Sequence, residues 1–286
     1  MAEAPVLKSV AAVRRKKRLK TTSLQLSPSG ISAFQQCRQR YKFLYIDKLG
    51  DKYGRPRPYF TMANHVHATV KDFLSLRPVY LRTEAAIAEI LQRNWQRYRV
   101  GFRGKADEER WRAKALAQVR AFVTRHDVKI IPIMQEEFLR TEVAPGVVLC
   151  GRVDRVDKQL DGSLHLIDYK TGNVPHEMDW AQLEFHALIL SKRLPMPVSK
   201  ASYLYLADSS LQSTAISPER LDQAHWNALT VARQIHKEKK FATSPGLWCR
   251  NCDFLPICPN ESELSPAAEG QLELWDDFSD EGSGSD

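Results

Sequence analysis

The sequence predicts an α/β fold, in which a mixed β-sheet is flanked by helices. Apolar residues recur with helical periodicity from Ser27 to about residue 126, whereas alternating, β-branched stretches follow from Ile130 onward. A helical pattern returns over residues 179–192, between the third and the fourth predicted strand. The order helix, three strands, helix, strand is typical of a sheet with helices packed on its faces. The strands are predicted over 134–143, 147–156, 164–170 and 201–207, and a last helix over 218–239.

Residues 1–24 form a basic segment that is expected to be a disordered arm. Its like charges repel one another and suit a nucleic acid, with a transit peptide as the alternative. The segment lacks the apolar core of a secretory signal, so a cytoplasmic location is expected. No apolar run approaches the roughly 18 residues of a membrane span, and no membrane partner is expected. The cations of the arm are Arg14, Arg15, Lys16, Lys17, Arg18 and Lys20.

The first helix is predicted from Ser27-Pro28-Ser29, where a hydroxyl cap precedes an early proline. Its apolar stripe continues at three-to-four spacing as far as Tyr45 and includes Cys37. By this pattern alone, Cys37 would be a thiol of the core.

A polar loop over 51–58 precedes a helix over 61–76, and two longer amphipathic helices are predicted over 84–99 and 107–126. The two longer helices are interpreted as a helical insertion, residues 77–130, without a catalytic constellation. Four aromatic residues at helical spacing in this part either belong to the core or stack on bases. They are Trp95, Tyr98, Phe102 and Trp111.

A β-hairpin around the turn at Asp161-Gly162 brings two carboxylates and a lysine together. Asp154 lies on its first strand, and Asp168 and Lys170 lie two apart on its second, so that they share a face. Carboxylates this close raise each other's pKa unless a cation lies between them. A hard divalent cation would relieve that conflict. The alternative is an exposed ion pair without function.

Three segments around this hairpin resemble the motifs of a known family. They are Gly-Arg-Val-Asp ending at Asp154, Asp-Tyr-Lys-Thr-Gly starting at Asp168, and Gln182 in the helix that follows. The pattern resembles a PD-(D/E)xK nuclease of the RecB type. The resemblance implies a restriction-endonuclease-like fold over residues 25–260 and cleavage of DNA with Mg²⁺ or Mn²⁺.

The resemblance also implies a role for each matching residue. Asp154 and Asp168 would bind the metal ion, together with the backbone carbonyl of Tyr169. Lys170 would orient or deprotonate the attacking water, and Gln182 would contact Lys170 or a substrate phosphate.

Three positions beside these motifs depart from the family pattern or leave a choice open. The family's upstream metal-binding histidine corresponds to His67, although Asn64 replaces the glycine of its motif and His65 is a rival. His186 takes the place of the tyrosine that follows Gln182 in the family motif. Two further polar residues of the hairpin are expected to be ordinary surface residues. They are Asp157 and His165.

Three of the five cysteines are crowded at Cys249, Cys252 and Cys258. In a cytosolic protein this spacing indicates a metal site rather than disulfides, and a site of four thiolates needs a fourth ligand. Cys37 is the expected fourth ligand, with Cys150 as the alternative. The layout resembles the iron–sulfur subset of RecB-type nucleases, which implies a [4Fe–4S] cluster that ties the N-terminal helix to the C-terminal loop. Spacing alone leaves zinc as the alternative.

The net charge of +8 is unevenly distributed along the chain. Residues 261–286 hold nine acidic residues and no Lys or Arg, so the rest of the chain carries 42 basic against 25 acidic residues. A body this basic suits a polyanion, and the acidic tail is expected to be disordered. Within the tail, one short segment resembles the motif that binds the bacterial sliding clamp; a tail without a specific partner is the alternative. The segment comprises Gln271, Leu272, Leu274 and Trp275.

These expectations combine into one function. The chain is interpreted as a metal-dependent deoxyribonuclease, an exonuclease on single strands or free ends in DNA repair or recombination. The alternatives are a CRISPR adaptation nuclease that processes spacer precursors, and a DNA-binding module without catalysis.

Overall fold

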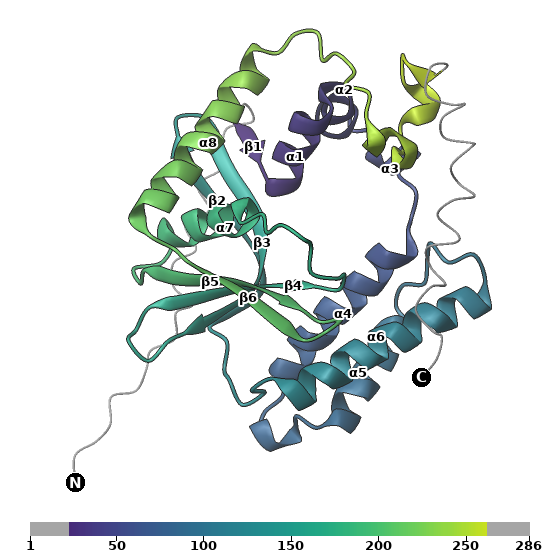
Figure 1. Ribbon diagram of the computed structural model, residues 1–286, viewed down its shortest axis with the longest axis vertical. Helices are drawn as coiled ribbons and strands as arrows, with labels where there is room; N and C mark the ends of the chain where they lie inside the picture. Colours follow the sequence, from purple (N-terminus) through teal and green to yellow (C-terminus); the bar gives the residue numbers. More distant parts are fainter. Residues whose placement is uncertain (1–22, 262–286) are drawn as a thin grey trace.

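A computed structural model describes residues 23–261 of the chain, which form a six-stranded sheet covered by helices on both faces (Figure 1). The strand order is β1-β3-β4-β5-β6, and β2 pairs with β3 outside this path. The strands are β1 (Leu24–Leu26), β2 (Met134–Ala144), β3 (Val147–Lys158), β4 (Leu164–Lys170), β5 (Val198–Tyr205) and β6 (Ser210–Ala215). Two strand pairs, β1–β3 and β4–β5, are parallel and the other three are antiparallel, which confirms the predicted mixed sheet.

The longer helices follow the predicted order, except that the first one is divided. The single helix predicted from Ser27 is divided at Cys37, whose backbone is extended, and a π-helical turn closes the segment. Cys37 is half-buried there and is not part of the core, so its interpretation as a core thiol was wrong. The longer helices are α1 (Pro28–Gln36), α4 (Pro58–Leu74), α5 (Glu84–Trp95), α6 (Lys105–Arg125), α7 (Ala181–Ser191) and α8 (Pro218–Lys237). The shorter ones are α2 (Arg38–Tyr41), the π-turn Lys42–Ile46 and α3 (Gly50–Tyr53). Three 3₁₀ turns lie at Val79–Leu81, Leu247–Asn251 and Leu255–Ile257.

The sheet separates two apolar cores. Helices α1, α7 and α8 cover one face, where Leu166 and Tyr203 belong to the first core. Helices α4, α5 and α6 form a lobe against the other face, where Ile167 and Leu204 belong to the second (Figure 1). Because side chains alternate along a strand, neighbours on β4 enter different cores. The sheet thereby holds the helical lobe and the rest of the chain in one fixed arrangement.

The described residues revise the boundary predicted for the N-terminal arm. Leu24 begins strand β1 and pairs with Val147, so the predicted segment 1–24 overlaps the sheet. The cations of the arm and the predicted clamp-binding segment, Gln271–Trp275, lie outside the described residues. Among the helices of residues 23–261, none has both the length and the apolar character to cross a membrane.

Candidate active site

The candidate site lies where strands β3 and β4 part. Their pairing runs from Lys158 with Leu164 to Arg155 with Ile167, and Asp154 and Asp168 are the next residues on the two strands. Asp154 Oδ2 accepts a hydrogen bond of 2.9 Å from the backbone N–H of Tyr169, which the parting strands leave free for it. Both carboxylates are buried, so the hairpin presents them at the bottom of a cleft rather than on an open surface.

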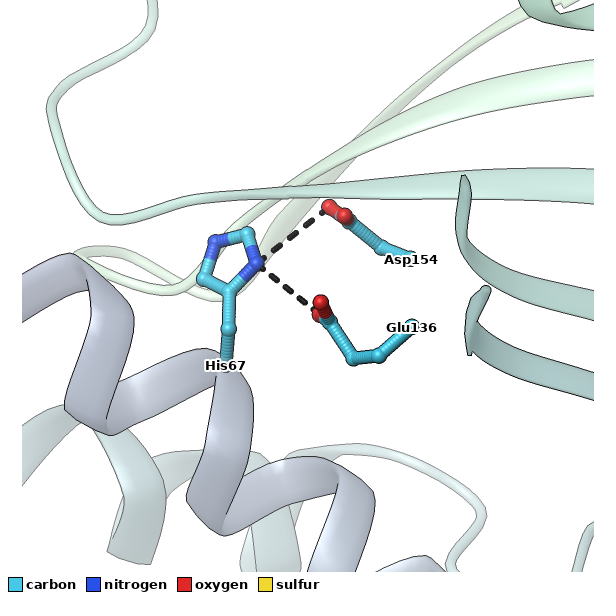
Figure 2. Close-up of side chains that lie close together, drawn as sticks. All are labelled: His67, Glu136 and Asp154. Atoms are coloured by element: carbon cyan, nitrogen blue, oxygen red, sulfur yellow. Dashed lines mark hydrogen bonds and ion pairs between the residues drawn. The ribbon is translucent and has the colours of Figure 1, made fainter. Parts of the chain in front are cut away.

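A histidine from α4 and a glutamate from β2 complete one group around Asp154. Figure 2 shows the side chains of His67, Glu136 and Asp154 pointing toward one another. His67 Nδ1 lies 3.2 Å from Glu136 Oε1 and 3.5 Å from Asp154 Oδ2. One ligand atom from each of the three residues lies within 4.8 Å of the others. We call this group the His–Glu–Asp trio.

Sheet register brings Glu136 to Asp154. Its neighbours Gln135 and Glu137 pair with Arg155 and Val153, which flank Asp154 on β3. The backbone of Glu136 has a φ of 49°, in the left-handed region that a non-glycine residue adopts only at a cost. Such strain collects where the surrounding structure fixes a functional side chain.

The trio holds its charges as a buried acid–base group. Burial lowers the pKa of His67, but its hydrogen bonds to Asp154 and Glu136 outweigh burial and raise the pKa to about 10. Burial would raise the pKa of Asp154, but His67 and the Tyr169 N–H hold this pKa below its usual value. A positive charge between the two carboxylates therefore stabilises the site.

Asp168 and Lys170 lie beside the trio and are joined by Gln182 of α7. Lys170 Nζ is 2.7 Å from Asp168 Oδ2 and donates a hydrogen bond of 2.9 Å to Gln182 Oε1. Gln182 Nε2 in turn donates to Asp168 Oδ1 at 2.8 Å. Burial, and next to it the charge of Asp154, raise the pKa of Asp168 to about 6. The predicted contact between Gln182 and Lys170 is thus present.

These donors fit a hard divalent cation. The trio offers two carboxylates and one imidazole nitrogen, a set that suits Mg²⁺ or Mn²⁺. Asp168 Oδ2 is buried and has the Lys170 ion pair but no hydrogen bond of suitable angle, so it retains lone pairs for a further ligand. A bound ion would take over the positive charge that the His67 proton now supplies.

The structure separates the two histidines of α4. His67 faces the trio, whereas His65 Nε2 lies 2.6 Å from the carbonyl oxygen of Tyr98 and its ring packs against Trp95 in the helical lobe. Burial lowers the pKa of His65. The geometry therefore favours His67 over His65 as the metal ligand.

His186 packs over the first glycine of the hairpin motif. A Cβ atom at Gly151 would lie 2.6 Å from His186 Nε2, so only glycine leaves room for this ring. His186 is buried, and burial lowers its pKa to about 4. The substitution of histidine for the tyrosine of the family motif is thus accommodated by packing on Gly151.

Sequence reasoning missed Glu136. It belongs to the run Gln135-Glu136-Glu137 in a predicted strand, where acidic residues ordinarily face solvent, and it matches no motif. The only signal for its role is the register of β2 against β3, which a single sequence does not provide.

The prediction that Asp157 is an ordinary surface residue was wrong, and His165 is half-buried rather than fully exposed. Asp157 is buried and accepts two hydrogen bonds from Arg155, at 2.9 and 2.6 Å. His165 Nε2 lies 2.7 Å from Ser202 Oγ, and burial lowers the pKa of His165 to about 4. The hairpin pattern did not reveal these contacts, and that of His165 joins two strands of the packed sheet rather than residues of one strand.

Removal of Asp157 should strongly destabilise the fold. Asp157→Ala leaves the buried Arg155 guanidinium without its partner, which should lower the free energy of unfolding by about 3–5 kcal/mol. Urea unfolding at neutral pH measures this change. Asp222→Ala on the exposed side of α8 is the control, with a change of about 0.5 kcal/mol or less. The double change Arg155→Met with Asp157→Leu should recover most of the loss; a small effect of Asp157→Ala alone would contradict the argument.

The predicted metal-binding cysteines meet around one pocket. Cys37, Cys249, Cys252 and Cys258 all line it, with Phe43 and Phe254 among its apolar walls. The alternative ligand, Cys150, lies on β3 and lines the cleft of the candidate active site instead. The structure thus separates Cys150 from the other four cysteines.

An open cleft of about 1480 Å³ leads to the trio and to Lys170. This exceeds the roughly 300–1,000 Å³ of ordinary small-molecule pockets. Its walls come from α1, α4, α6, α7 and the strands β2 to β4, so the site is accessible to an extended ligand.

A mixed sheet with buried carboxylates, an Asp-x-Lys pair and a histidine at the bottom of an open cleft is the arrangement of a metal-dependent nuclease. Residues 25–259 match the model of the PD-(D/E)XK nuclease superfamily, and the chain belongs to this family.

Comparison with solved structures gives distant matches, of which two are described. One is a "putative exonuclease" from Eubacterium rectale, which shares 10% sequence identity over 82% of this chain and 89% of its own, with a TM-score of 0.47. The other, SSO0001, shares 15% identity over 70% of this chain and 94% of its own, with a TM-score of 0.36. No curated protein matches the sequence at a significant level. The family assignment therefore rests on the family model.

Proposed function

We propose that the chain is a metal-dependent deoxyribonuclease that cuts single strands or free DNA ends, as an exonuclease of DNA repair or recombination. The observation that carries this proposal is the position of the His–Glu–Asp trio beside the linked side chains of Asp168, Lys170 and Gln182. The family supplies the reaction class, the hydrolysis of phosphodiesters.

Each side chain has a distinct part in this reaction. His67, Glu136 and Asp154, with Asp168 beside them, would hold Mg²⁺ or Mn²⁺, which supplies charge stabilisation and acidifies water when it is bound. Lys170 orients the attacking water or accepts its proton, and its cation offsets the charge of the phosphate. Gln182 holds both Lys170 and Asp168 in position, because its amide bonds to each. Asp154 is fixed by the Tyr169 N–H. We include the carbonyl of Tyr169 as a further metal ligand, as the family motif implies.

Digestion of end-labelled DNA tests the proposal. Single-stranded, duplex and circular single-stranded substrates are incubated with the purified full chain and Mg²⁺ or Mn²⁺. An exonuclease releases short products from the linear single strand and leaves the circle intact. Cleavage of the circle would replace the exonuclease assignment by an endonuclease, and lack of cleavage on every substrate would contradict the nuclease.

We also propose that the four grouped cysteines bind a [4Fe–4S] cluster. Half-buried thiols around one pocket are suitable ligands for a metal centre. The choice of a cluster over a single zinc ion follows from the layout of the cysteines, which resembles that of the iron–sulfur subset of RecB-type nucleases.

The pH dependence of metal binding follows from the raised pKa of His67. In the metal-free protein this imidazole keeps its proton up to a pKa of about 10, and a metal ion must displace that proton. Raising the pH from 7 to 8 should therefore strengthen Mn²⁺ binding about tenfold, as measured by titration calorimetry. By the same linkage, the stability that the His67 charge gives the metal-free protein is present below pH 6.5 and is lost as the pH rises through about 10.

His67→Gln is the matched control for this dependence. The variant should bind Mn²⁺ more weakly and lose most of the change between pH 7 and pH 8, because no proton is displaced at this position. An unchanged pH slope in His67→Gln would show that another group provides the proton.

A further inference from the structure

Helix α4 presents one continuous row of side chains to the cleft. Phe60, Asn64, His67 and Lys71 follow one another at helical spacing, and all four line the cleft. With a rise of 1.5 Å per residue, Phe60 lies about 10 Å from His67 along the axis, and Lys71 about 6 Å beyond it. The row therefore contains an aromatic ring, the candidate metal ligand and a cation, and its length matches a few nucleotides of an extended strand.

The aromatic end of this row is exposed although it is apolar. Tyr59 and Phe60 form the first turn of α4, and 45% and 59% of their surfaces are open to solvent. Their ring centroids lie 4.5 Å apart at an angle of 50°, so they form one aromatic surface in the cleft wall. Tyr45 and Phe138, which also line the cleft, are 39% and 52% exposed. Aromatic faces left open at a functional cleft indicate a ligand that covers them.

Cations accompany these rings along the cleft. Lys71, Lys114 and Arg152 line it, and the side chain of Arg152 is 60% exposed only two residues before Asp154 on β3. Phosphates match such cations, and bases match the rings. The faces of bases are free only in an unpaired strand, because a duplex covers them by stacking. The occupant that fits both features is a single-stranded nucleic acid.

We propose that Tyr59 and Phe60 form a base-stacking site that binds an unpaired nucleotide a short distance from the phosphate to be cut, and that this site selects single strands over duplex. The inference rests on the proposed function, since it takes the scissile phosphate to lie at the His–Glu–Asp trio. According to this inference, two residues outside the catalytic group discriminate between paired and unpaired substrates.

Binding to labelled oligonucleotides tests the site. Fluorescence anisotropy is measured with the full chain in Ca²⁺, which holds the substrate with slow cleavage. Replacing both rings, Tyr59→Ala with Phe60→Ala, should weaken binding of a single-stranded oligonucleotide roughly tenfold to a hundredfold and change duplex binding less than about twofold. Phe60→Trp should keep the affinity, whereas Phe60→Leu should lose much of it, because leucine preserves the apolar surface without a face for stacking. Trp226→Ala, at a 58% exposed aromatic on α8 that is not part of the cleft lining, is the matched control and should leave binding unchanged.

A set of oligonucleotides with one abasic position each locates the stacked base. In the wild type, an abasic nucleotide at one or two positions should weaken binding. In the double variant, an abasic nucleotide at the same position should have no effect, because the stacking contact has already been removed. Equal losses for single strand and duplex, or abasic penalties that persist in the double variant, would overturn the inference. If either of these results is obtained and the protein still cleaves DNA, the nuclease assignment is unaffected. A wild type that does not cleave but shows the coupled abasic penalty contradicts the nuclease and supports the stacking site.

Discussion

Asp168→Asn is expected to reduce DNA cleavage by about a thousandfold or more while DNA binding changes little. The substitution removes the charge that pairs with Lys170 at 2.7 Å and replaces a buried carboxylate by a neutral amide. A neutral amide oxygen binds a hard cation less strongly than a charged carboxylate, and loss of groups that act in the transition state reduces the rate far more than the affinity. Most of the binding energy for a nucleic acid comes from contacts of cations with phosphates, which the variant retains.

The measurement is single-turnover cleavage of a labelled single strand with Mg²⁺, together with anisotropy for binding. Lys170→Met and Glu136→Gln should show large losses as well, the first because the water loses its orienting group and the second because the trio loses a charged ligand. Asp222→Asn, an equivalent change at an exposed position of α8, should leave the rate unchanged. Wild-type cleavage by Asp168→Asn would refute the assigned site, and wild-type cleavage by Glu136→Gln would restrict the metal ligands to those that the motifs predict.

Loss of the cysteine-bound centre is the second large effect that we expect. Cys37→Ser should remove iron and the visible absorption of the purified protein as completely as Cys252→Ser does, although the two positions are 215 residues apart in sequence. The midpoint of thermal unfolding should fall by at least about 5 °C, because the proposed centre would join the N-terminal helices to the C-terminal loop. Cys150→Ser is the matched control and should keep both iron and colour, since Cys150 lies on β3 in the other cleft.

Anaerobic purification, with assays of iron, sulfide and zinc, decides the identity of the metal. Protein without colour that carries one zinc ion per chain would show that the cluster assignment is wrong and that the ligand set is right. Retention of iron in Cys37→Ser would contradict the ligand set itself.

Loss of the proposed centre should also affect the position of helix α4. Arg57 immediately precedes α4, and its guanidinium donates to Asn251 O at 2.8 Å and to Asp253 Oδ1 at 2.9 Å. Arg55 reaches the same aspartate at 3.3 Å. The loop that carries Cys252 is therefore anchored to the start of the helix that presents His67.

The sequence by itself determined the hairpin and the polar residues that it brings together. Asp154, Asp168 and Lys170 lie within 17 residues of one another, and the turn at Asp161-Gly162 with strand alternation is enough to bring them together. Gln182 follows on the next helix and meets Lys170 as expected. Local patterns of this kind predict secondary structure, because short segments have few ways to fold. The mixed sheet followed from the order of the same patterns.

Only the tertiary structure decided which distant residues complete the site. His65 and His67 are two residues apart on a helix and so point about 200° apart around its axis, and the packing of α4 on the sheet selects His67. Glu136 reaches Asp154 through the register of β2 on β3, and Asp157 is buried together with its partner Arg155. Cys37 joins the other cysteines because the chain bends out of its helix there. Each of these facts depends on contacts between segments far apart in the chain, for which a single sequence carries no local signal.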